Sequence, residues 1–224
     1  MESMATTMSG HDVTVASEGV TLRGLLGVPS NARGVVLFAH GSGSGRLSSR
    51  NNFVARSLQE AGLATLLIDL LTVEEERADA ATGHLRFDIA FLALRLVAAT
   101  RWLRESTETR ALHIGYFGAS TGAAAALVAA GEIPDEVHAV VSRGGRPDLA
   151  GDSLPEVEAP TLLIVGSRDV PVIPLNQDAF NKLRCEKKLE IVSGASHLFE
   201  EPGTLEEVSR LASAWFTSHL GVRD

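Results

Sequence analysis

A serine between two glycines is the first candidate for chemistry in this sequence. Ser120 stands in Gly118-Ala119-Ser120-Thr121-Gly122, directly after an apolar run and directly before an alanine-rich stretch. A sharp turn from a strand into a helix exposes such a serine, and it needs small flanking residues because backbone atoms come close together there. The pattern predicts that Ser120 is a nucleophile; the alternative is a serine that only links a strand to a helix.

A nucleophilic serine needs a base, because its hydroxyl reacts poorly until the proton is taken away. His197 lies between the last apolar run and the last helical pattern, in a predicted loop. His113 and His138 lie inside apolar runs, where a core or strand position is expected, and His84 lies in a charged stretch. We therefore predict His197 as the general base, with His84 as a weaker competitor.

The histidine in turn needs a carboxylate that holds its tautomer and stabilises the imidazolium. Asp169 leaves the carboxyl end of the apolar run 162–165, next to the run that leads to His197. We predict that Asp169 orients His197. Asp148 and Asp152, which follow the preceding apolar run, remain alternatives, since either could instead cap a loop.

A tetrahedral oxyanion requires two converging donors, usually backbone N–H groups. The sequence His40-Gly41-Ser42-Gly43-Ser44-Gly45 follows the first long apolar run. We expect the amides of Ser42 and Thr121 to form the oxyanion hole. Alone, the glycines could mean a flexible loop, and the spacing matches neither of the common phosphate-binding patterns.

Arginines are concentrated in the loops that follow the predicted strands. They are Arg46, Arg50, Arg143, Arg146 and Arg168. We expect Arg143, Arg146 and Arg46 to bind an anionic group of the substrate, since guanidinium groups match carboxylates and phosphates bidentately. In the alternative interpretation, they pair with nearby acids in Glu74-Glu75-Glu76, at Asp79 or at Asp148.

Apolar runs that alternate with helical patterns predict parallel strands covered by helices on both faces. The six runs are 35–39, 64–68, 112–117, 137–141, 162–165 and 189–192, and the helical patterns are 51–61, 88–106, 122–130 and a last helix from Thr204. Thr204-Leu205-Glu206-Glu207 predicts a capping box at the start of that helix. The stretch 71–86 is predicted to be a charged loop.

Two further strands are predicted before these, around 13–15 and 22–28, as an antiparallel pair that turns at Glu18-Gly19. The total is eight strands. About twenty residues separate the runs ending at Val141 and beginning at Thr161, which is too few for a large cap over the site.

Together the HGSGSG turn, GASTG, Asp169 and the His197 loop resemble the α/β-hydrolase superfamily, and the compact length is similar to its dienelactone hydrolase-like branch. The resemblance runs from about Thr14 to the end. It implies a single-domain α/β-hydrolase fold, a mostly parallel eight-stranded sheet with helices on both faces, and the order serine, aspartate, histidine. Dienelactone hydrolases proper use a cysteine nucleophile, whereas this chain has Ser120, and Cys185 lies far away in the sequence.

Composition narrows the remaining possibilities. The 224 residues, 45% of them hydrophobic, predict one domain over 1–224, with 1–10 as a flexible extension. A net charge of −8 argues against nucleic acid as a binding partner. A single cysteine and an N-terminal stretch unlike a signal peptide favour the cytoplasm, and no apolar run is long enough to span a membrane.

The sequence therefore predicts a serine hydrolase that cleaves a small carboxylic ester, thioester or lactone through an acyl-serine intermediate. No metal-binding pattern is present, and the chemistry requires no cofactor. A hydrolase-fold protein that binds a small molecule without turnover, or an acyltransferase, would use the same residues. Both a monomer and a homodimer are compatible with the sequence.

Overall fold

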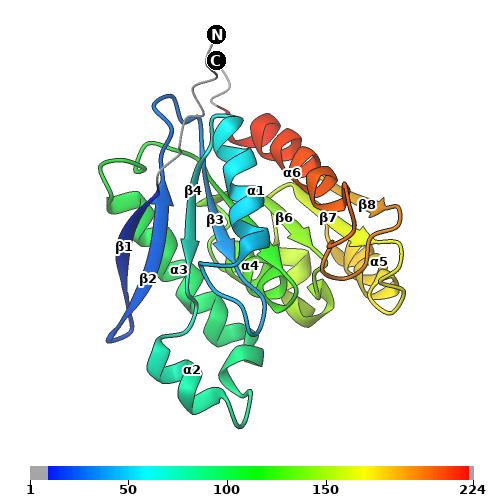
Figure 1. Ribbon diagram of the computed structural model, residues 1–224, viewed down its shortest axis with the longest axis horizontal. Coiled ribbons are helices and arrows are strands. Elements are labelled where there is room, and N and C mark those ends of the chain that lie inside the picture. Colours follow the sequence, from blue (N-terminus) through cyan, green and yellow to red (C-terminus); the bar gives the residue numbers. More distant parts are fainter. Residues whose placement is uncertain (1–9, 222–224) are drawn as a thin grey trace.

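An eight-stranded sheet lies between two layers of helices in the computed structural model, which describes residues 10–221 (Figure 1). The strand order is β1-β2-β4-β3-β5-β6-β7-β8. β2 pairs antiparallel with both β1 and β4, and all the other strand pairs are parallel. The strands are β1 (His11–Ser17), β2 (Val20–Gly27), β3 (Val35–Ala39), β4 (Ala64–Ile68), β5 (Ile114–Ala119), β6 (Val137–Arg143), β7 (Thr161–Gly166) and β8 (Lys187–Val192).

Helices cover both faces of the sheet, each over its own apolar core. α1 and α6 pack on one face, and α3, α4 and α5 on the other. The helices are α1 (Ser49–Glu60), α2 (Val73–Asp79), α3 (Ile89–Glu105), α4 (Thr121–Glu132), α5 (Ile173–Lys182) and α6 (Thr204–Leu220), with two 3-10 segments, η1 (Leu85–Phe87) and η2 (Pro147–Glu156). This arrangement confirms the predicted fold class.

Burial on both faces explains why the central strands are apolar throughout. Every residue of β3, β4, β5 and β7 is buried. α4 packs closely against the sheet because its residues are mostly alanine and glycine, and nine of its residues are buried. The predicted hairpin is also present: Glu18 and Gly19 both have positive φ, as a two-residue turn between twisted strands requires.

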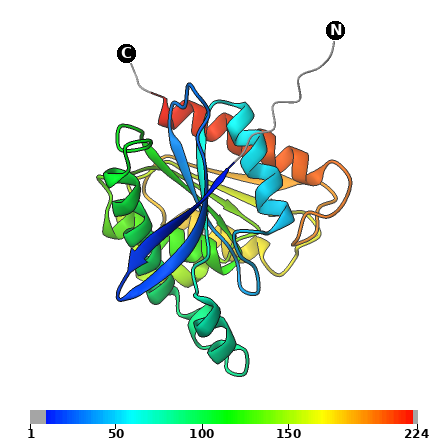
Figure 2. The ribbon, with the colours of Figure 1, turned by 60° about the vertical axis from the view of Figure 1, so that its left-hand side comes forward.

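The stretch 71–86 is not only a loop, as predicted, but contains α2 and reaches η1. Thr72 and Glu75 form a capping box: the Thr72 hydroxyl accepts from the Glu75 amide at 3.1 Å, and the Glu75 carboxylate accepts from the Thr72 amide at 2.7 Å. The acidic first turn also suits the positive end of the helix. α2 and the turn after it project from the body of the molecule (Figure 2).

The capping box predicted at Thr204 is wrong. Thr204 is the first residue inside α6, and the cap position is taken by Gly203, which has a φ of 82°. The Thr204 hydroxyl donates backwards to the Glu201 carbonyl at 2.7 Å. A turn that needs a left-handed residue therefore places the glycine at the cap and moves the threonine into the helix.

The β6–β7 connection contains only η2, so no large cap covers the strand ends at this point, as predicted. Of the expected N-terminal extension 1–10, only Gly10 is described, and residues 1–9 lie outside the described residues. Among residues 10–221, no helix has the length and apolar character needed to cross a bilayer.

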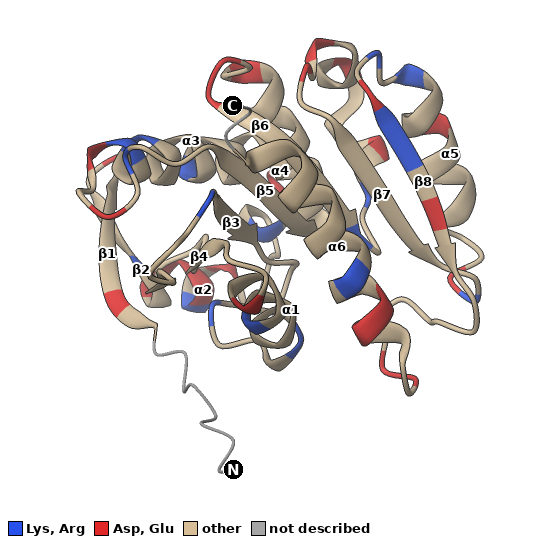
Figure 3. Ribbon diagram, turned by 90° about the horizontal axis from the view of Figure 1, so that it is seen from above, with Lys and Arg blue, Asp and Glu red and all other residues tan. Residues whose placement is uncertain are grey.

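The edge strand β8 contains charged residues of both signs (Figure 3). Lys187, Lys188 and Glu190 interrupt an otherwise apolar strand, and Lys188 pairs with Glu190 at 2.7 Å. Charges on an edge strand disfavour pairing with a strand of another chain.

Tyr116 joins the sheet to α3 by a buried hydrogen bond. Its hydroxyl lies 2.5 Å from the Thr100 hydroxyl, and both residues are almost completely buried. β5 leads directly to Ser120, so this contact also holds the strand that carries the candidate nucleophile.

Replacing only one of these two hydroxyls should destabilise the fold. Tyr116→Phe leaves the Thr100 hydroxyl buried without its partner, and we expect a loss of about 1–3 kcal/mol in the free energy of unfolding. The double variant Tyr116→Phe/Thr100→Val removes both polar groups and should recover most of that loss. Urea unfolding of the three proteins measures this, and a double variant less stable than Tyr116→Phe would contradict it.

Candidate active site

Ser120 occupies a strained turn between β5 and α4. Its φ of 51° and ψ of −123° lie in a region that residues with a side chain rarely adopt. Gly122 permits the turn: a Cβ there would lie 2.3 Å from the Ala39 carbonyl oxygen. Gly118 is equally constrained, because its Cβ would lie 2.4 Å from Ala123 Cα. The small residues predicted from the sequence are thus required by backbone contacts.

Asp169 and His197 are joined by a hydrogen bond, with 2.7 Å between Asp169 Oδ2 and His197 Nδ1. Asp169 follows β7 and is buried, whereas His197 lies in the loop after β8 and is partly exposed. Backbone hydrogen bonds tie the two loops together: the Arg168 amide donates to Ala195, and the Gly194 amide donates to the Ser167 hydroxyl.

The alternative acids and base lie elsewhere. Asp148 forms two hydrogen bonds with Arg146, at 2.8 and 2.9 Å, and Asp152 is exposed on η2. His84 is exposed in the turn between α2 and η1. Among these candidates, Asp169 is the carboxylate in contact with His197.

Ser120 and His197 line one cavity of about 270 Å³ at the carboxyl end of the parallel strands. We call it the triad pocket; its other walls come from the loop that follows β3, from the start of α1 and from Arg143. No hydrogen bond joins Ser120 to His197 in this structure. Catalytic hydrogen bonds of this kind are often long in free enzymes and shorten when substrate binds.

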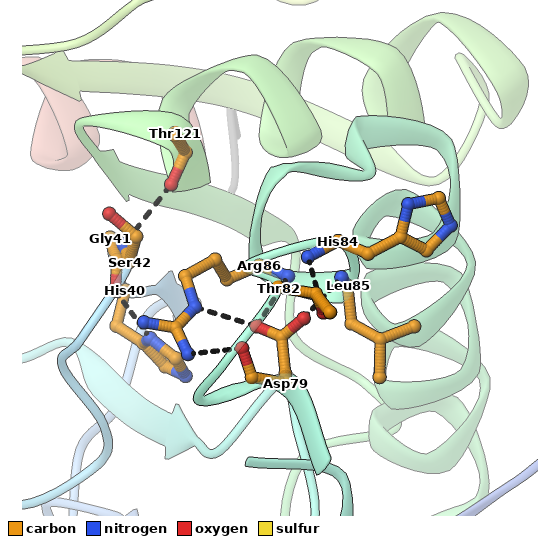
Figure 4. Close-up of polar contacts among 9 residues, drawn as sticks. All are labelled: His40, Gly41, Ser42, Asp79, Thr82, His84, Leu85, Arg86 and Thr121. Atoms are coloured by element: carbon orange, nitrogen blue, oxygen red, sulfur yellow. Dashed lines mark hydrogen bonds and ion pairs between the residues drawn. The ribbon is translucent and has the colours of Figure 1, made fainter. Parts of the chain in front are cut away.

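The amides of Ser42 and Thr121 come from segments that contact each other. The Ser42 amide donates to the Thr121 hydroxyl at 3.2 Å (Figure 4). Thr121 is the first residue of α4, so its own amide has no acceptor within the helix. A helix N-terminus also favours negative charge nearby.

His40 holds the loop that contains Ser42. Its Nε2 accepts from the Leu70 amide at 2.9 Å, so the ring proton is on Nδ1, which donates to the Gly41 carbonyl at 2.9 Å. Burial lowers the pKa of His40 below its ordinary value of 6.5, which keeps the ring neutral. The Gly41 carbonyl belongs to the same peptide group as the Ser42 amide, so His40 also orients that amide.

Of the three predicted substrate-binding arginines, only Arg143 lines the triad pocket. It is 7% exposed, and its one hydrogen bond is a long one, 3.5 Å to the Asn51 side chain. Within the described residues, its Nε and Nη1 have no acceptor. Burial and the neighbouring Arg50 lower its pKa to about 10, which leaves the guanidinium charged at neutral pH.

Arg146 and Arg46 are paired with carboxylates outside the triad pocket. Arg146 binds Asp148, and Arg46 binds Asp69 at 2.5 Å. Sequence reasoning did not select Arg50, which lines the triad pocket and pairs with Glu200 at 2.9 Å. It directly follows Ser48 and Ser49 in the sequence, and this position carried no signal beyond its charge.

Cys185 is remote from this site. Its thiol donates to the hydroxyl of Thr161 at 3.7 Å, at the amino end of β7, and burial raises its pKa. A buried thiol of raised pKa is a poor nucleophile. Within residues 10–221, no three His, Cys, Asp or Glu side chains are grouped as metal ligands.

The model of the dienelactone hydrolase family matches residues 22–217. A crystal structure of a dienelactone hydrolase from Anabaena variabilis is 60% identical, with a TM-score of 0.93 over 95% of this chain and 98% of that one. A dienelactone hydrolase-like promiscuous phosphotriesterase from metagenomic libraries is 20% identical with a TM-score of 0.77, over 95% of this chain and 99% of that one, which shows a shared fold.

A protein of Mycobacterium tuberculosis H37Rv, named "Putative phosphoribosyl transferase", is 57% identical over 210 residues. The match covers 94% of this chain but 46% of that protein. The chain thus spans about half the length of the curated relatives it matches.

Acid should destabilise the protein through His40. Its pKa is lower in the folded than in the unfolded chain, so the unfolded chain binds more protons as the pH falls below 6.5, and stability falls with it. His40→Gln should flatten this dependence, since glutamine does not titrate. Urea unfolding at several pH values tests it, with His84→Gln as an exposed control that should leave the dependence unchanged. Equal pH dependence in wild type and His40→Gln would contradict the role given to this histidine.

Proposed function

Because the chain belongs to the dienelactone hydrolase family, we propose that it is a serine hydrolase acting on a small carboxylic ester, thioester or lactone. The observation that carries the proposal is the hydrogen bond of 2.7 Å between Asp169 and His197, beside a serine held at positive φ in the same pocket. The name phosphoribosyl transferase belongs to proteins of which this chain covers less than half.

In the proposed reaction His197 takes the Ser120 proton as Ser120 Oγ attacks the carbonyl carbon. Asp169 accepts from His197 Nδ1–H and stabilises the imidazolium that forms. The amides of Ser42 and Thr121 bind the oxyanion. His197 then protonates the leaving group. In the second half of the reaction, His197 takes a proton from water as the water oxygen attacks the acyl carbon, and it returns this proton to Ser120 Oγ as the acid is released.

The Ser42 amide already has an acceptor, the Thr121 hydroxyl. An oxyanion is a stronger acceptor than a neutral hydroxyl, so it should replace or share this hydrogen bond. The hydroxyl would keep the amide oriented in the free enzyme, which limits reorganisation during the reaction.

Ser120 should be the residue that a fluorophosphonate probe labels, and Ser120→Ala should abolish both labelling and ester hydrolysis. Asp169→Asn should reduce kcat by roughly three to four orders of magnitude, because the histidine loses its orienting carboxylate. Asp148→Asn is the matched control and should have little effect, since Asp148 binds Arg146 instead. Labelling that persists in Ser120→Ala would remove the proposal. Tight substrate binding without turnover would favour a binding protein, and product that requires an added alcohol would favour acyl transfer.

The anionic preference expected from the sequence now rests on Arg143 alone among the three predicted arginines. A buried cation without a carboxylate partner is costly in the free protein, and an anionic ligand would supply the missing acceptors. Arg143 shares its pocket with His197, which must reach the leaving group. We therefore assign the acidic group to the leaving group of the substrate.

Arg143→Met should lower kcat/KM on 4-acetoxybenzoate about ten- to a hundredfold, matching about 1.5–3 kcal/mol for a charge-assisted hydrogen bond. The neutral analogue 4-acetoxybenzamide should be hardly affected. Arg146→Met, at a paired arginine outside the pocket, should change neither rate. Since Arg143 is buried without a carboxylate partner, its removal should leave the free energy of unfolding equal or higher. Equal losses on both esters, together with lower stability, would show that Arg143 only supports the loop.

A further inference from the structure

A second cavity adjoins the triad pocket and is much larger, at about 700 Å³. It lies between the His40–Arg50 loop, the segment that follows β4, and the start of α3. Sites that enclose a small molecule usually measure about 300–1,000 Å³. The triad pocket, at about 270 Å³, is too small for most substrates, whereas the neighbouring cavity has the appropriate size.

The loop after β3 borders both cavities. Gly41, Ser42, Ser44, Ser48 and Arg50 line each of them. Ser120 and His197 line only the triad pocket, whereas Thr121 lines the larger cavity together with Ser42. Of the proposed oxyanion donors, Thr121 therefore faces the larger cavity and Ser42 borders both, whereas the base faces the smaller one.

This division suggests which cavity holds the leaving group of an ester and which holds its acyl chain. The leaving group must lie on the side of His197, which protonates it, and so in the triad pocket. The oxyanion points at the amides of Ser42 and Thr121. The acyl chain occupies another corner of the same tetrahedral carbon, so with the leaving group on the side of His197 it is directed toward the neighbouring larger cavity. Resting on the proposed function, we propose that the larger cavity is the acyl compartment and takes an uncharged acyl chain of medium length.

The walls of the compartment favour such a chain. Leu70, Leu71 and Leu92 are buried and form apolar wall. Leu47 and Val73 also line it, yet they are 73% and 43% exposed. A hydrocarbon chain would cover both side chains and remove apolar surface from water, which is favourable in proportion to the area.

The arginines of the compartment are already paired with carboxylates, including Arg50, which binds Glu200. Arg46 binds Asp69, and Arg86 binds Asp79 through its Nε at 2.6 Å. The Asp79 carboxylate, fully buried, also accepts from the Leu85 amide at 2.6 Å, and Arg86 extends from there toward His40 and Ser42 (Figure 4). Paired charges give this wall a fixed shape without an unpaired cation for an acidic acyl group, in contrast to Arg143.

A chain-length series tests the compartment. In wild type, kcat/KM on p-nitrophenyl esters should rise about two- to fourfold per methylene from acetate to hexanoate. Val73→Trp places a bulky side chain at the exposed rim and should lower kcat/KM on hexanoate about tenfold or more while hardly changing acetate. Leu94→Trp is the control: Leu94 is a similarly exposed residue on α3 that lines neither cavity, and its replacement should leave both esters unaffected.

The outcomes separate this inference from the proposed function. Acetate hydrolysis with no increase along the series, or an equal effect of Val73→Trp on acetate and hexanoate, overturns the acyl compartment and leaves the serine hydrolase intact. If the wild-type protein hydrolyses no ester and Ser120 is not labelled, both the acyl compartment and the serine hydrolase are overturned. An increase with chain length that Val73→Trp abolishes and Leu94→Trp retains supports the compartment.

Discussion

The close approach between the start of α4 and the end of β3 is the constraint on which the candidate site depends. Gly122 lies against the carbonyl oxygens of Ala39 and His40, where no side chain fits. This contact determines where α4 begins, so Ser120 is left at positive φ with Thr121 as the first helical residue. Because Gly41 and Ser42 follow immediately after the same carbonyls, one packing contact sets the spacing of the nucleophile and both proposed oxyanion donors.

Charge is distributed unevenly between the two cavities. In the large cavity, the guanidinium groups of Arg46, Arg50 and Arg86 each bind a carboxylate. Arg143, in the triad pocket, has two N–H groups without acceptors. Burying this guanidinium is expected to cost free energy that the rest of the core must offset. Such a residue is expected at a binding site rather than in a scaffold, because stability and function often compete at the same position.

Local pattern predicted most of the fold, and it failed where a side chain had competing roles. Apolar runs predicted the six parallel strands, because parallel strands covered by helices on both faces are apolar throughout; of the six, the edge strand β8 is only partly buried. The capping box of α2, formed by Thr72 and Glu75, was readable in the sequence but was not recognised among the surrounding acidic residues. The same pattern at Thr204 forms no capping box, because Gly203 takes the cap position. Asp169 and His197 meet as predicted, because chain order and strand ends determine their positions. Which arginine lacks a partner depends on contacts between distant segments, such as Arg46 with Asp69, and no local pattern contains that information.

The segment around α2 is held by its own contacts more than by the loops that carry Ser120, Asp169 and His197. These contacts are its capping box, the Asp79 interactions and the ion pair of 2.7 Å between Glu75 and Arg95 on α3. None of them involves Ser120, Asp169 or His197. It nevertheless supplies Val73 and Arg86 to a cavity beside them. Such a wall can change without disturbing Ser120, Asp169 and His197, so a protein engineer could exchange this segment to alter the cavity while those three residues stay in place.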